Sequence, residues 1–270
     1  MNLPKGGFMQ VFSKFTRDRM ILFSLVSNDL RARYLTNYFG ILWVFIQPVA
    51  TTIILWFVFQ FGFKSSVHTS FPFVLWLVCG LVPWFFIVEA LNSGCSSIRE
   101  NSYLVKKIVF NVSLLPVVKI GSAVVVHCFF VLVFIALLLI YGYMPTLYWL
   151  QVFYYIFCML SLLLAVAWIT SSIVIFFPDL HQLISMGVQF GFWLTPVFWN
   201  IDNMTGGVAG FLRFSPFAYV VEGFRDSFIR GVWFWDRIDQ TLVFWAVVIA
   251  LMLIGLRTFK KLRPHFADVL

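Results

Sequence analysis

Very few ionisable side chains lie within the apolar stretches of this sequence. Glu89 stands at the end of one stretch, Asp179 and His181 lie in a short turn, and His127 lies inside another stretch. Ionisable groups within a membrane commonly carry a proton or bind an ion. A single histidine is more often an ordinary core residue, so the pattern gives little support to a proton-coupled or ion-coupled carrier.

Motifs for catalysis and nucleotide binding are absent from the sequence. It contains no HExxH, GxSxG or GxxxxGK[ST], and no Gly is followed by Lys. The chain is therefore not expected to be an enzyme, to bind a metal, or to bind ATP through a phosphate loop. A membrane-embedded transferase acting on polyprenyl phosphate would need acidic metal ligands or a base, and few carboxylates are available. The four cysteines form no CxxC pair and are interpreted as small apolar fillers.

The composition is that of a protein that lies in a membrane. Of the 270 residues, 61% are hydrophobic and 11% are charged, and the mean hydropathy is +0.94. A soluble domain of this size could not bury so much apolar surface in one core. The net charge of +8 comes from Lys and Arg that flank apolar stretches, which indicates membrane topology rather than nucleic-acid binding. The predicted fold class is an all-α polytopic membrane protein.

Uncharged stretches define the predicted membrane spans. A helix needs about 20 apolar residues to cross a bilayer. The uncharged stretch 120–177 is too long for one helix, and the segment Tyr141-Gly-Tyr-Met-Pro145 divides it, because Gly and Pro favour a turn. Six spans are predicted, the last two of them short and the fifth interrupted by Pro196: 39–62, 71–88, 120–140, 147–176, 182–200 and 241–256.

Lys and Arg residues orient these spans. Fourteen lie in the N-terminal segment, the 89–119 connection and the C-terminal tail, and five lie on the opposite side. Because positively charged connections stay in the cytoplasm, both termini are predicted to be cytoplasmic. Apolar residues recur near helical spacing at the start of the chain, so residues 1–33 are predicted to form an amphipathic interface helix. A plain basic tail is the alternative.

Two long connections are rich in apolar residues. A short amphipathic helix within 89–119 would need a cover, and its residues favour lipid and a protein partner equally. The 201–238 connection is predicted to form two short helices that dip back into the membrane as a re-entrant hairpin, with a turn near Ser215-Pro216. Glu222 and Arg225 are three residues apart and could pair on one helix face. A hairpin lying on the membrane surface is the alternative.

Five groups of segments, spread over nearly the whole chain, carry a family resemblance. They are NDLRARY (28–34) with FGILW (39–43) and QP (47–48), KKIVF (106–110) with LLP (114–116), FPDL (177–180) with LTPVF (194–198), SPF (215–217) with VEGFR (221–225), and RPHFADVL (263–270). In this order they resemble the polysaccharide-export branch of the ABC-2 permeases, which includes the Wzm-like permeases of O-antigen export. The sequence departs from that pattern at Asn28, Pro178 and Ser215, where Arg, Arg and Asn are usual.

The resemblance implies an assembly and two functional segments. The assembly is a homodimer of six-span subunits with two copies of a separate Wzt-like ATPase subunit, which would hold ATP and Mg²⁺, so that this chain binds no cofactor itself. Segment 98–110 would be a cytoplasmic coupling helix that docks into the ATPase, and segment 205–230 would be an extracytoplasmic gate. The implied coupling residues are Ser102, Tyr103, Leu104, Lys106, Lys107 and Phe110, and the implied gate residues are Ser215, Pro216, Phe217, Glu222 and Arg225.

Two further groups of residues are candidates for contact with a lipid-linked glycan. Arg31, Arg33 and Tyr34 lie where a lipid diphosphate would meet the inner leaflet, and Arg binds phosphate bidentately; positive-inside anchoring explains the two Arg residues equally well. Aromatic faces suit a sliding sugar chain, although aromatic residues also form ordinary interfacial belts. The candidate channel-lining aromatics are Tyr38, Trp43, Trp56, Trp84, Trp193, Phe198 and Trp199.

The predicted function is that of an ABC permease subunit in the bacterial inner membrane. The family exports glycans attached to a polyprenyl diphosphate such as undecaprenyl diphosphate, and O antigen is the preferred substrate here. Permeases for capsule polysaccharide, teichoic acid, or a small lipid or drug are the alternatives within the family. A channel or structural subunit without an ATPase is the alternative outside it.

Overall fold

The structure of the protein, a computed structural model, describes residues 22–33, 40–62, 71–105, 111–201 and 207–270, and the regular elements in these ranges are all helical. A first helix covers residues 22–33. The longer helices are α2 (Trp43–Phe57), α3 (Phe73–Glu100), α5 (Leu114–Ile140), α6 (Val152–Ile173), α7 (Leu180–Leu194), α9 (Pro216–Arg225) and α10 (Ile238–Leu262). The shorter ones are η1 (Gly40–Leu42), η2 (Val58–Gly62), α4 (Ser102–Val105), η3 (Leu147–Gln151), α8 (Gly207–Arg213), η5 (Asp226–Arg230), η6 (Phe234–Arg237), η7 (Arg263–His265) and α11 (Phe266–Val269).

Five helical segments are long and apolar enough to cross a membrane: Val44–Gly62, Phe73–Glu100, Leu114–Ile140, Leu147–Ile173 and Phe234–Val269. A polytopic all-α membrane protein is thereby confirmed. Three segments extend beyond the predicted bounds, since α3 runs on to Glu100, α5 begins at Leu114 and α10 continues to Leu262. Charged residues end an apolar run in the sequence, but they do not end a helix. A prediction based on apolar runs therefore could not include the polar ends of these helices.

The predicted fifth span, 182–200, corresponds to a shorter helix. α7 has 15 residues, which is about 22 Å at 1.5 Å per residue and less than the roughly 30 Å of a hydrocarbon core. It ends at Leu194 because Thr195 adopts an extended backbone, with φ −80° and ψ 139°. The residue before a proline is biased towards that conformation, and Pro196 follows.

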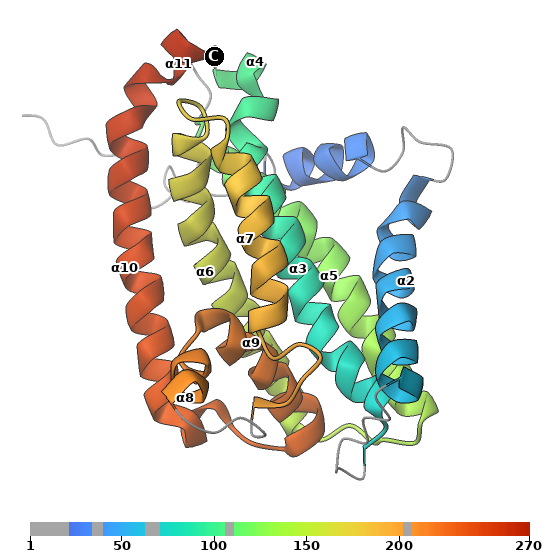
Figure 1. The fold of residues 1–270 in the computed structure, drawn as a ribbon. Helices are drawn as coiled ribbons and strands as arrows, with labels where there is room; N and C mark the ends of the chain where they lie inside the picture. The colour runs from blue at the N-terminus through green and yellow to red at the C-terminus, as the bar shows by residue number, and fades with distance from the viewer. Residues whose placement is uncertain (1–21, 34–39, 63–70, 106–110, 202–206) are drawn as a thin grey trace, which may run out of the picture.

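The long helices run side by side, with α3 at the centre of the bundle (Figure 1). α5 and α6 pack on α3, and α10 packs on α6. α10 approaches α6 closely at Gly255, where an added Cβ would lie 2.9 Å from the carbonyl oxygen of Ala165. We call the end with α4 and α11 the C-terminal end, and the end with α8 and α9 the hairpin end.

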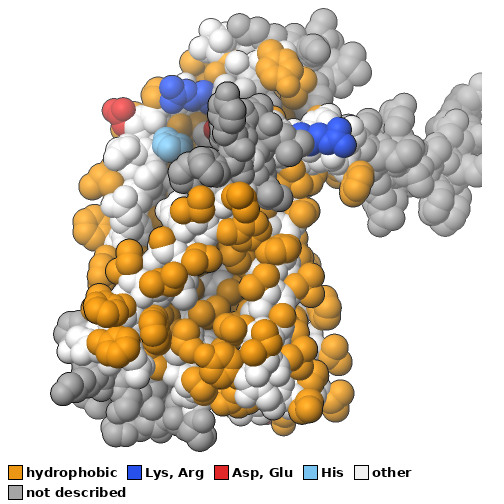
Figure 2. All heavy atoms as spheres, turned by 90° about the vertical axis from the view of Figure 1, so that its right-hand side faces the viewer, with side chains coloured by type: hydrophobic (Ala, Val, Ile, Leu, Met, Phe, Trp, Pro, Cys, Tyr) orange, Lys and Arg blue, Asp and Glu red, His pale blue; other side chains and the backbone are white. Residues whose placement is uncertain are grey.

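Helices α2 and α3 differ sharply in burial. α3 contributes a large share of the core, including Leu75, Cys79 and Ala90, which are fully buried. None of the apolar window of α2 is buried. Figure 2 shows the face on the α2 side, where hydrophobic side chains cover the surface and the charged side chains gather near the C-terminal end. This apolar face requires lipid or another protein chain as a cover.

Candidate functional site

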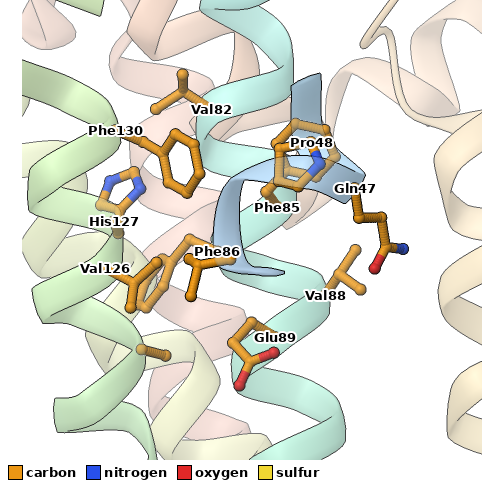
Figure 3. Close-up of a pocket in the computed structure, with 12 residues that line it drawn as sticks. Gln47, Pro48, Val82, Phe85, Phe86, Val88, Glu89, Val126, His127 and Phe130 are labelled. Atoms are coloured by element: carbon orange, nitrogen blue, oxygen red, sulfur yellow. The ribbon is translucent and has the colours of Figure 1, made fainter. Parts of the chain in front are cut away.

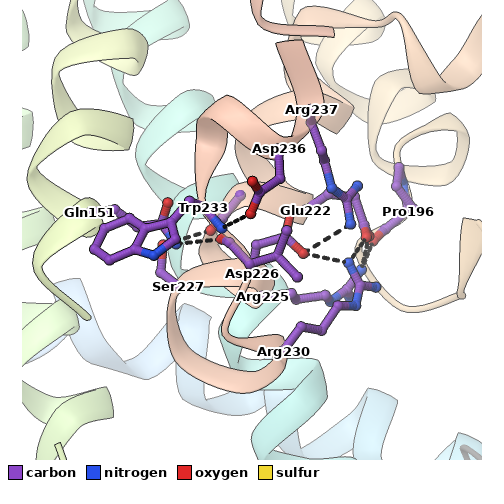
Figure 4. Close-up of polar contacts among 12 residues, drawn as sticks. Gln151, Pro196, Glu222, Arg225, Asp226, Ser227, Arg230, Trp233, Asp236 and Arg237 are labelled. Carbon is purple, nitrogen blue, oxygen red and sulfur yellow. Dashed lines mark hydrogen bonds and ion pairs between the residues drawn. The ribbon is translucent and has the colours of Figure 1, made fainter. Parts of the chain in front are cut away.

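The segment between α7 and α10 carries a compact group of buried charges, which we call the α9 cluster: Glu222, Arg225, Asp226, Arg230 and Arg237 (Figure 4). Arg225 Nη1 lies 2.6 Å from Glu222 Oε1, and Arg230 Nη1 lies 2.6 Å from Glu222 Oε2. Asp226 Oδ1 accepts from Arg230 and Arg237, each at 3.0 Å. The predicted pairing of Glu222 with Arg225 is present in the structure.

Helix geometry places these side chains together. α9 begins with Pro216 at its first turn after the extended residue Ser215, which suits the fixed φ of proline and its missing donor. Glu222 and Arg225 are three residues apart, and Asp226 and Arg230 are four apart, so each pair shares a helix face. Two short helices, α8 and α9, lie on either side of Ser215, and their predicted re-entry into the membrane stays a prediction.

Arg225 anchors this segment to α3 and to the chain that follows α7. Its side chain is fully buried and donates to the backbone carbonyls of Pro196 at 2.5 Å and Val197 at 2.6 Å. Its guanidinium carbon lies 3.5 Å from the ring centroid of Trp76 on α3. A Cβ added at Gly80 of α3 would lie 2.7 Å from Arg225 Nη2. Arg225 thus links α9 to α3 and to the chain that follows α7.

The carboxylate of Glu222 balances the positive charge of the buried Arg225. Burial alone would raise the pKa of Glu222, but the neighbouring Arg225 and Arg230 hold that pKa below its usual value. Glu222 therefore remains ionised near neutral pH, as a buried arginine requires.

Gln151 was not singled out from the sequence, although it is almost fully buried at the end of η3, directly before α6. It donates to the carbonyl of Val232 at 2.7 Å and accepts from the backbone N–H of Phe234 at 3.1 Å. Gln151 therefore holds the backbone of residues 232–234, which follows η5, next to the start of α6. The only sequence signal for this role is a polar residue at the edge of an apolar run.

Several predicted aromatics gather at the hairpin end. Trp193 packs edge-on against Phe198 with 5.1 Å between ring centroids, and Trp84 lies 6.3 Å from Phe217, a predicted gate residue. Phe192, which the sequence did not single out, joins them at 5.9 Å from Trp84 and 5.2 Å from Phe198. We call these five residues the aromatic cluster. Trp193 is 61% exposed, whereas Trp84 is buried.

The remaining predicted aromatics are distributed differently. Trp199 lies beside the aromatic cluster and donates from its indole N–H to the carbonyl of Trp193 at 3.1 Å. Trp56 lies apart, on α2, where its ring packs edge-on against Phe61. Tyr38 and the side chain of Trp43 lie outside the described part of the structure. The predicted aromatics therefore do not form one continuous surface within the described part of the chain.

Comparison with known proteins identifies the family. The ABC-2 type transporter family matches residues 21–229. The chain belongs to this family. It is 26% identical over 259 residues to the O-antigen export system permease protein RfbA of Klebsiella pneumoniae, a match that covers 93% of this chain and 95% of that protein. The RfbA of Myxococcus xanthus is 26% identical over 261 residues, with the same coverage. The resemblance to O-antigen export permeases is thereby confirmed.

At the C-terminal end of this ABC-2 permease lies a second charge group, which we call the Asp29 cluster. Asp29 Oδ2 lies 2.9 Å from Arg33 Nε, and Asp29 Oδ1 lies 2.8 Å from Lys119 Nζ. Arg33 also pairs with Glu89, and Lys119 lies 2.7 Å from Glu100 Oε2. The cluster joins the 22–33 helix to α3 and α5. Sequence reasoning missed it because its members, apart from Asp29 and Arg33, lie far apart in the chain.

The two arginines predicted to contact a lipid diphosphate differ in their relation to this cluster. Arg33 is already paired with two carboxylates, whereas Arg31 is exposed. Tyr34 lies outside the described residues. In its present conformation, Arg33 is committed to holding the 22–33 helix against α3.

The predicted coupling segment is only partly described. Residues 98–100 complete α3, and Ser102, Tyr103 and Leu104 lie in the single turn α4 after Asn101. Tyr103 is exposed, and Leu104 packs on a small core that includes Phe266 of the terminal motif. Lys106, Lys107 and Phe110 lie outside the described residues.

Within the described ranges, no group of three or more His, Cys, Asp or Glu could hold a metal ion.

Proposed function

We propose that this ABC-2 permease is the transmembrane subunit of an exporter that carries a polyprenyl-diphosphate-linked polysaccharide, with O antigen as the first choice, across the bacterial inner membrane. The observation that carries the proposal is the similarity to O-antigen export permeases over 93% of the chain. A separate ATPase subunit would supply the energy, since the sequence has no phosphate loop.

Such an exporter must move a charged and polar substrate through the hydrocarbon core of the membrane. A diphosphate and a hydroxyl-rich polymer must cross about 30 Å of hydrocarbon, and moving an unpaired charge into that medium costs several kcal/mol or more. A lined path is therefore needed. The uncovered apolar face of α2 supports a homodimer whose path lies along the subunit interface.

The positions of the Lys and Arg residues also support an orientation of the chain in the membrane. Lys260, Lys261 and Arg263 lie at the C-terminal end of the bundle, beside α11. By the positive-inside rule this end faces the cytoplasm, and α4 would then face the two ATPase subunits. The α8–α9 hairpin would form the extracytoplasmic gate, dipping back into the membrane.

The roles of individual residues follow from this orientation. Arg31, exposed beside the Asp29 cluster, is the better candidate for the lipid diphosphate, because Arg33 is held by two carboxylates. Trp193 and Trp199 would meet the sugar chain as it leaves. Glu222 and Arg225 would hold the gate in place, and Phe217 would connect the gate to Trp84.

The experiment is to delete the gene and locate the cell's long glycan. Lipid-linked polymer should accumulate on the cytoplasmic side, and export should return only when this chain and an active ATPase partner are both supplied. A normal surface glycan after deletion would overturn the proposal. ATP-dependent efflux of a small lipid or drug would then be the assay, since permeases of that kind are the alternative within the family.

A further inference from the structure

A cavity of about 430 Å³ lies at the C-terminal end of the bundle, between α10, η7, α6 and the start of α5. Trp168 on α6 and two residues of α10, Leu256 and Phe259, form much of its apolar wall. Lys260 and Arg263 also line it, and no carboxylate of the described residues does. The cavity therefore joins an apolar wall to two positive charges.

The two cations of this cavity distinguish it from the cavity between α2, α3 and α5 (Figure 3). The carboxylate that lines that other cavity belongs to Glu89, which already pairs with Arg33 in the Asp29 cluster. Lys260 and Arg263 are both exposed, and neither has an ion pair or a side-chain hydrogen bond within the ranges that the structure describes. Both side chains are therefore available to an anion.

Hydrogen bonds hold one wall of this cavity in place. Trp168 donates from its indole N–H to the carbonyl of Ser113 at 3.2 Å, which ties α6 to the start of α5. Ser113 also lines the cavity, and its hydroxyl donates to Asn111 Oδ1 at 2.8 Å. A hydroxyl oxygen whose hydrogen is used in this way still accepts a hydrogen bond. The lining thus offers two cationic donors and one acceptor, which match a phosphate group with a hydroxyl beside it.

An exposed apolar stripe on α10 continues from the cavity along the helix. It consists of Ile249, Leu253 and Leu256, which are 57%, 51% and 49% exposed. Intervals of four, three and four residues from Ile249 to Lys260 place all four on one helix face. This length is about 16 Å at 1.5 Å per residue, about half of a 30 Å hydrocarbon core. The stripe therefore spans the depth of one leaflet, on the side of the bundle opposite α2 (Figure 1).

We propose that this cavity and stripe bind one anionic phospholipid, with its phosphate between Lys260 and Arg263 and an acyl chain along the stripe. Basic pockets between membrane helices bind anionic lipid headgroups in this way. The phosphate supplies the negative charge that the lining lacks, and the acyl chain covers the exposed apolar side chains. The proposal does not depend on the export of a glycan, because it requires only that α10 crosses a membrane, for which it is long and apolar enough.

The test is native mass spectrometry of the full chain in neutral detergent, titrated with dioleoyl phosphatidylglycerol or with dioleoyl phosphatidylethanolamine. The two lipids share their acyl chains, but only phosphatidylglycerol has a net negative charge. It should bind at least about tenfold more tightly, and the double variant Lys260→Gln/Arg263→Gln should lose this preference. Leu253→Ser, on the stripe, should weaken the binding of both lipids.

Arg257 and Lys261 provide a matched control. They are exposed residues of the same helix that do not line the cavity, so Arg257→Gln/Lys261→Gln removes the same charge from outside the site. At an ionic strength of about 0.15 M, where the Debye length is about 8 Å, this variant should change the affinity by less than about threefold. Cations that only orient α10 predict an equal loss for both pairs, and equal losses would overturn the proposal. Without lipid, neither double variant should lower the melting temperature, since all four positions are exposed.

Other outcomes would also overturn the proposal. Equal affinity for the two lipids would indicate a surface that accepts any lipid. Displacement of phosphatidylglycerol by inorganic phosphate at a similar concentration would indicate a site for a free anion. Binding of neither lipid would leave the two cations to an acidic protein surface. Glycan export is tested separately, by gene deletion, so either proposal can fail while the other stands.

Discussion

The α9 cluster and the Asp29 cluster lie at opposite ends of the bundle and use the same residue types in different ways. The α9 cluster comes from one short segment, 222–237, and its Arg225 and Glu222 side chains are 0% and 6% exposed. The Asp29 cluster joins three separate segments of the chain, and its Glu89 and Glu100 side chains are 42% and 52% exposed. The first cluster is a buried anchor, whereas the second surrounds the buried pair of Asp29 and Lys119 with two carboxylates that water and salt can reach.

This difference has a mechanical consequence for an exporter. Arg225 binds the backbone after α7 and stacks on α3, so α9 and these two elements are expected to move as one unit. The 22–33 helix is attached to α3 through the exposed carboxylate of Glu89, which water screens, and to α5 through the buried pair of Asp29 and Lys119. A movement driven from the C-terminal end would therefore separate Glu89 and Glu100 from their partners before it separates the α9 cluster.

The largest expected effect comes from Arg225→Met. The substitution leaves the ionised carboxylate of Glu222 with one partner fewer and the carbonyls of Pro196 and Val197 without their donor. Breaking a buried pair by removing one partner typically costs about 3–5 kcal/mol. Unfolding in mixed detergent micelles measures the free energy of unfolding. Arg257→Met, an exposed position on α10, is the control and should change it by less than about 0.5 kcal/mol.

A cost below about 1 kcal/mol for Arg225→Met would contradict the anchor. Arg225→Lys tests whether a positive charge alone is sufficient for the anchor. Lys carries the charge but lacks the planar fork of donors that reaches Glu222 and two carbonyls at once. Its stability should fall between those of the wild type and Arg225→Met.

An intermediate effect is expected from Gly80→Ala. The new Cβ would lie 2.6 Å from the carbonyl oxygen of Val197 and 2.7 Å from Arg225 Nη2, so the anchor must shift. Overpacking of this kind costs about 1–3 kcal/mol. The matched control is Gly187→Ala on α7, where no atom lies within 4 Å of the new Cβ and Ala favours the helix by up to about 1 kcal/mol. Melting temperatures should therefore move in opposite directions, and equal shifts would show that α3 and α9 are not in tight contact.

The two clusters also show what could be predicted from the sequence. The pairing of Glu222 with Arg225 follows from helical spacing, and the turn at Ser215-Pro216 follows from the proline. The contacts of Arg225 with Trp76 and Val197 depend on tertiary packing, which spacing does not determine. The Asp29 cluster joins residues up to 90 positions apart, so helical spacing could indicate only its pair of Asp29 and Arg33.

The spans and the aromatic residues likewise show which features the sequence predicts and which depend on tertiary packing. Apolar runs located the cores of five spans, but they underestimated α3 and α10 because charged residues continue those helices. Composition identified aromatic residues as candidates for a sugar path. Only packing separates Trp193, which is exposed, from Trp84, which is buried.

The smallest expected effect comes from Glu100→Gln in the Asp29 cluster. Glu100 pairs with Lys119 at 2.7 Å and accepts from Ser96 Oγ at 2.6 Å, but its side chain is 52% exposed. Exposed pairs contribute about 0.2–1 kcal/mol, and Lys119 keeps Asp29 as a partner. The loss should shrink further in 1 M salt, where the Debye length is about 3 Å, whereas the loss in Arg225→Met should persist. Unfolding both variants at low and high salt tests this contrast, and a salt-independent loss of several kcal/mol for Glu100→Gln would mean that the two clusters are equally rigid anchors.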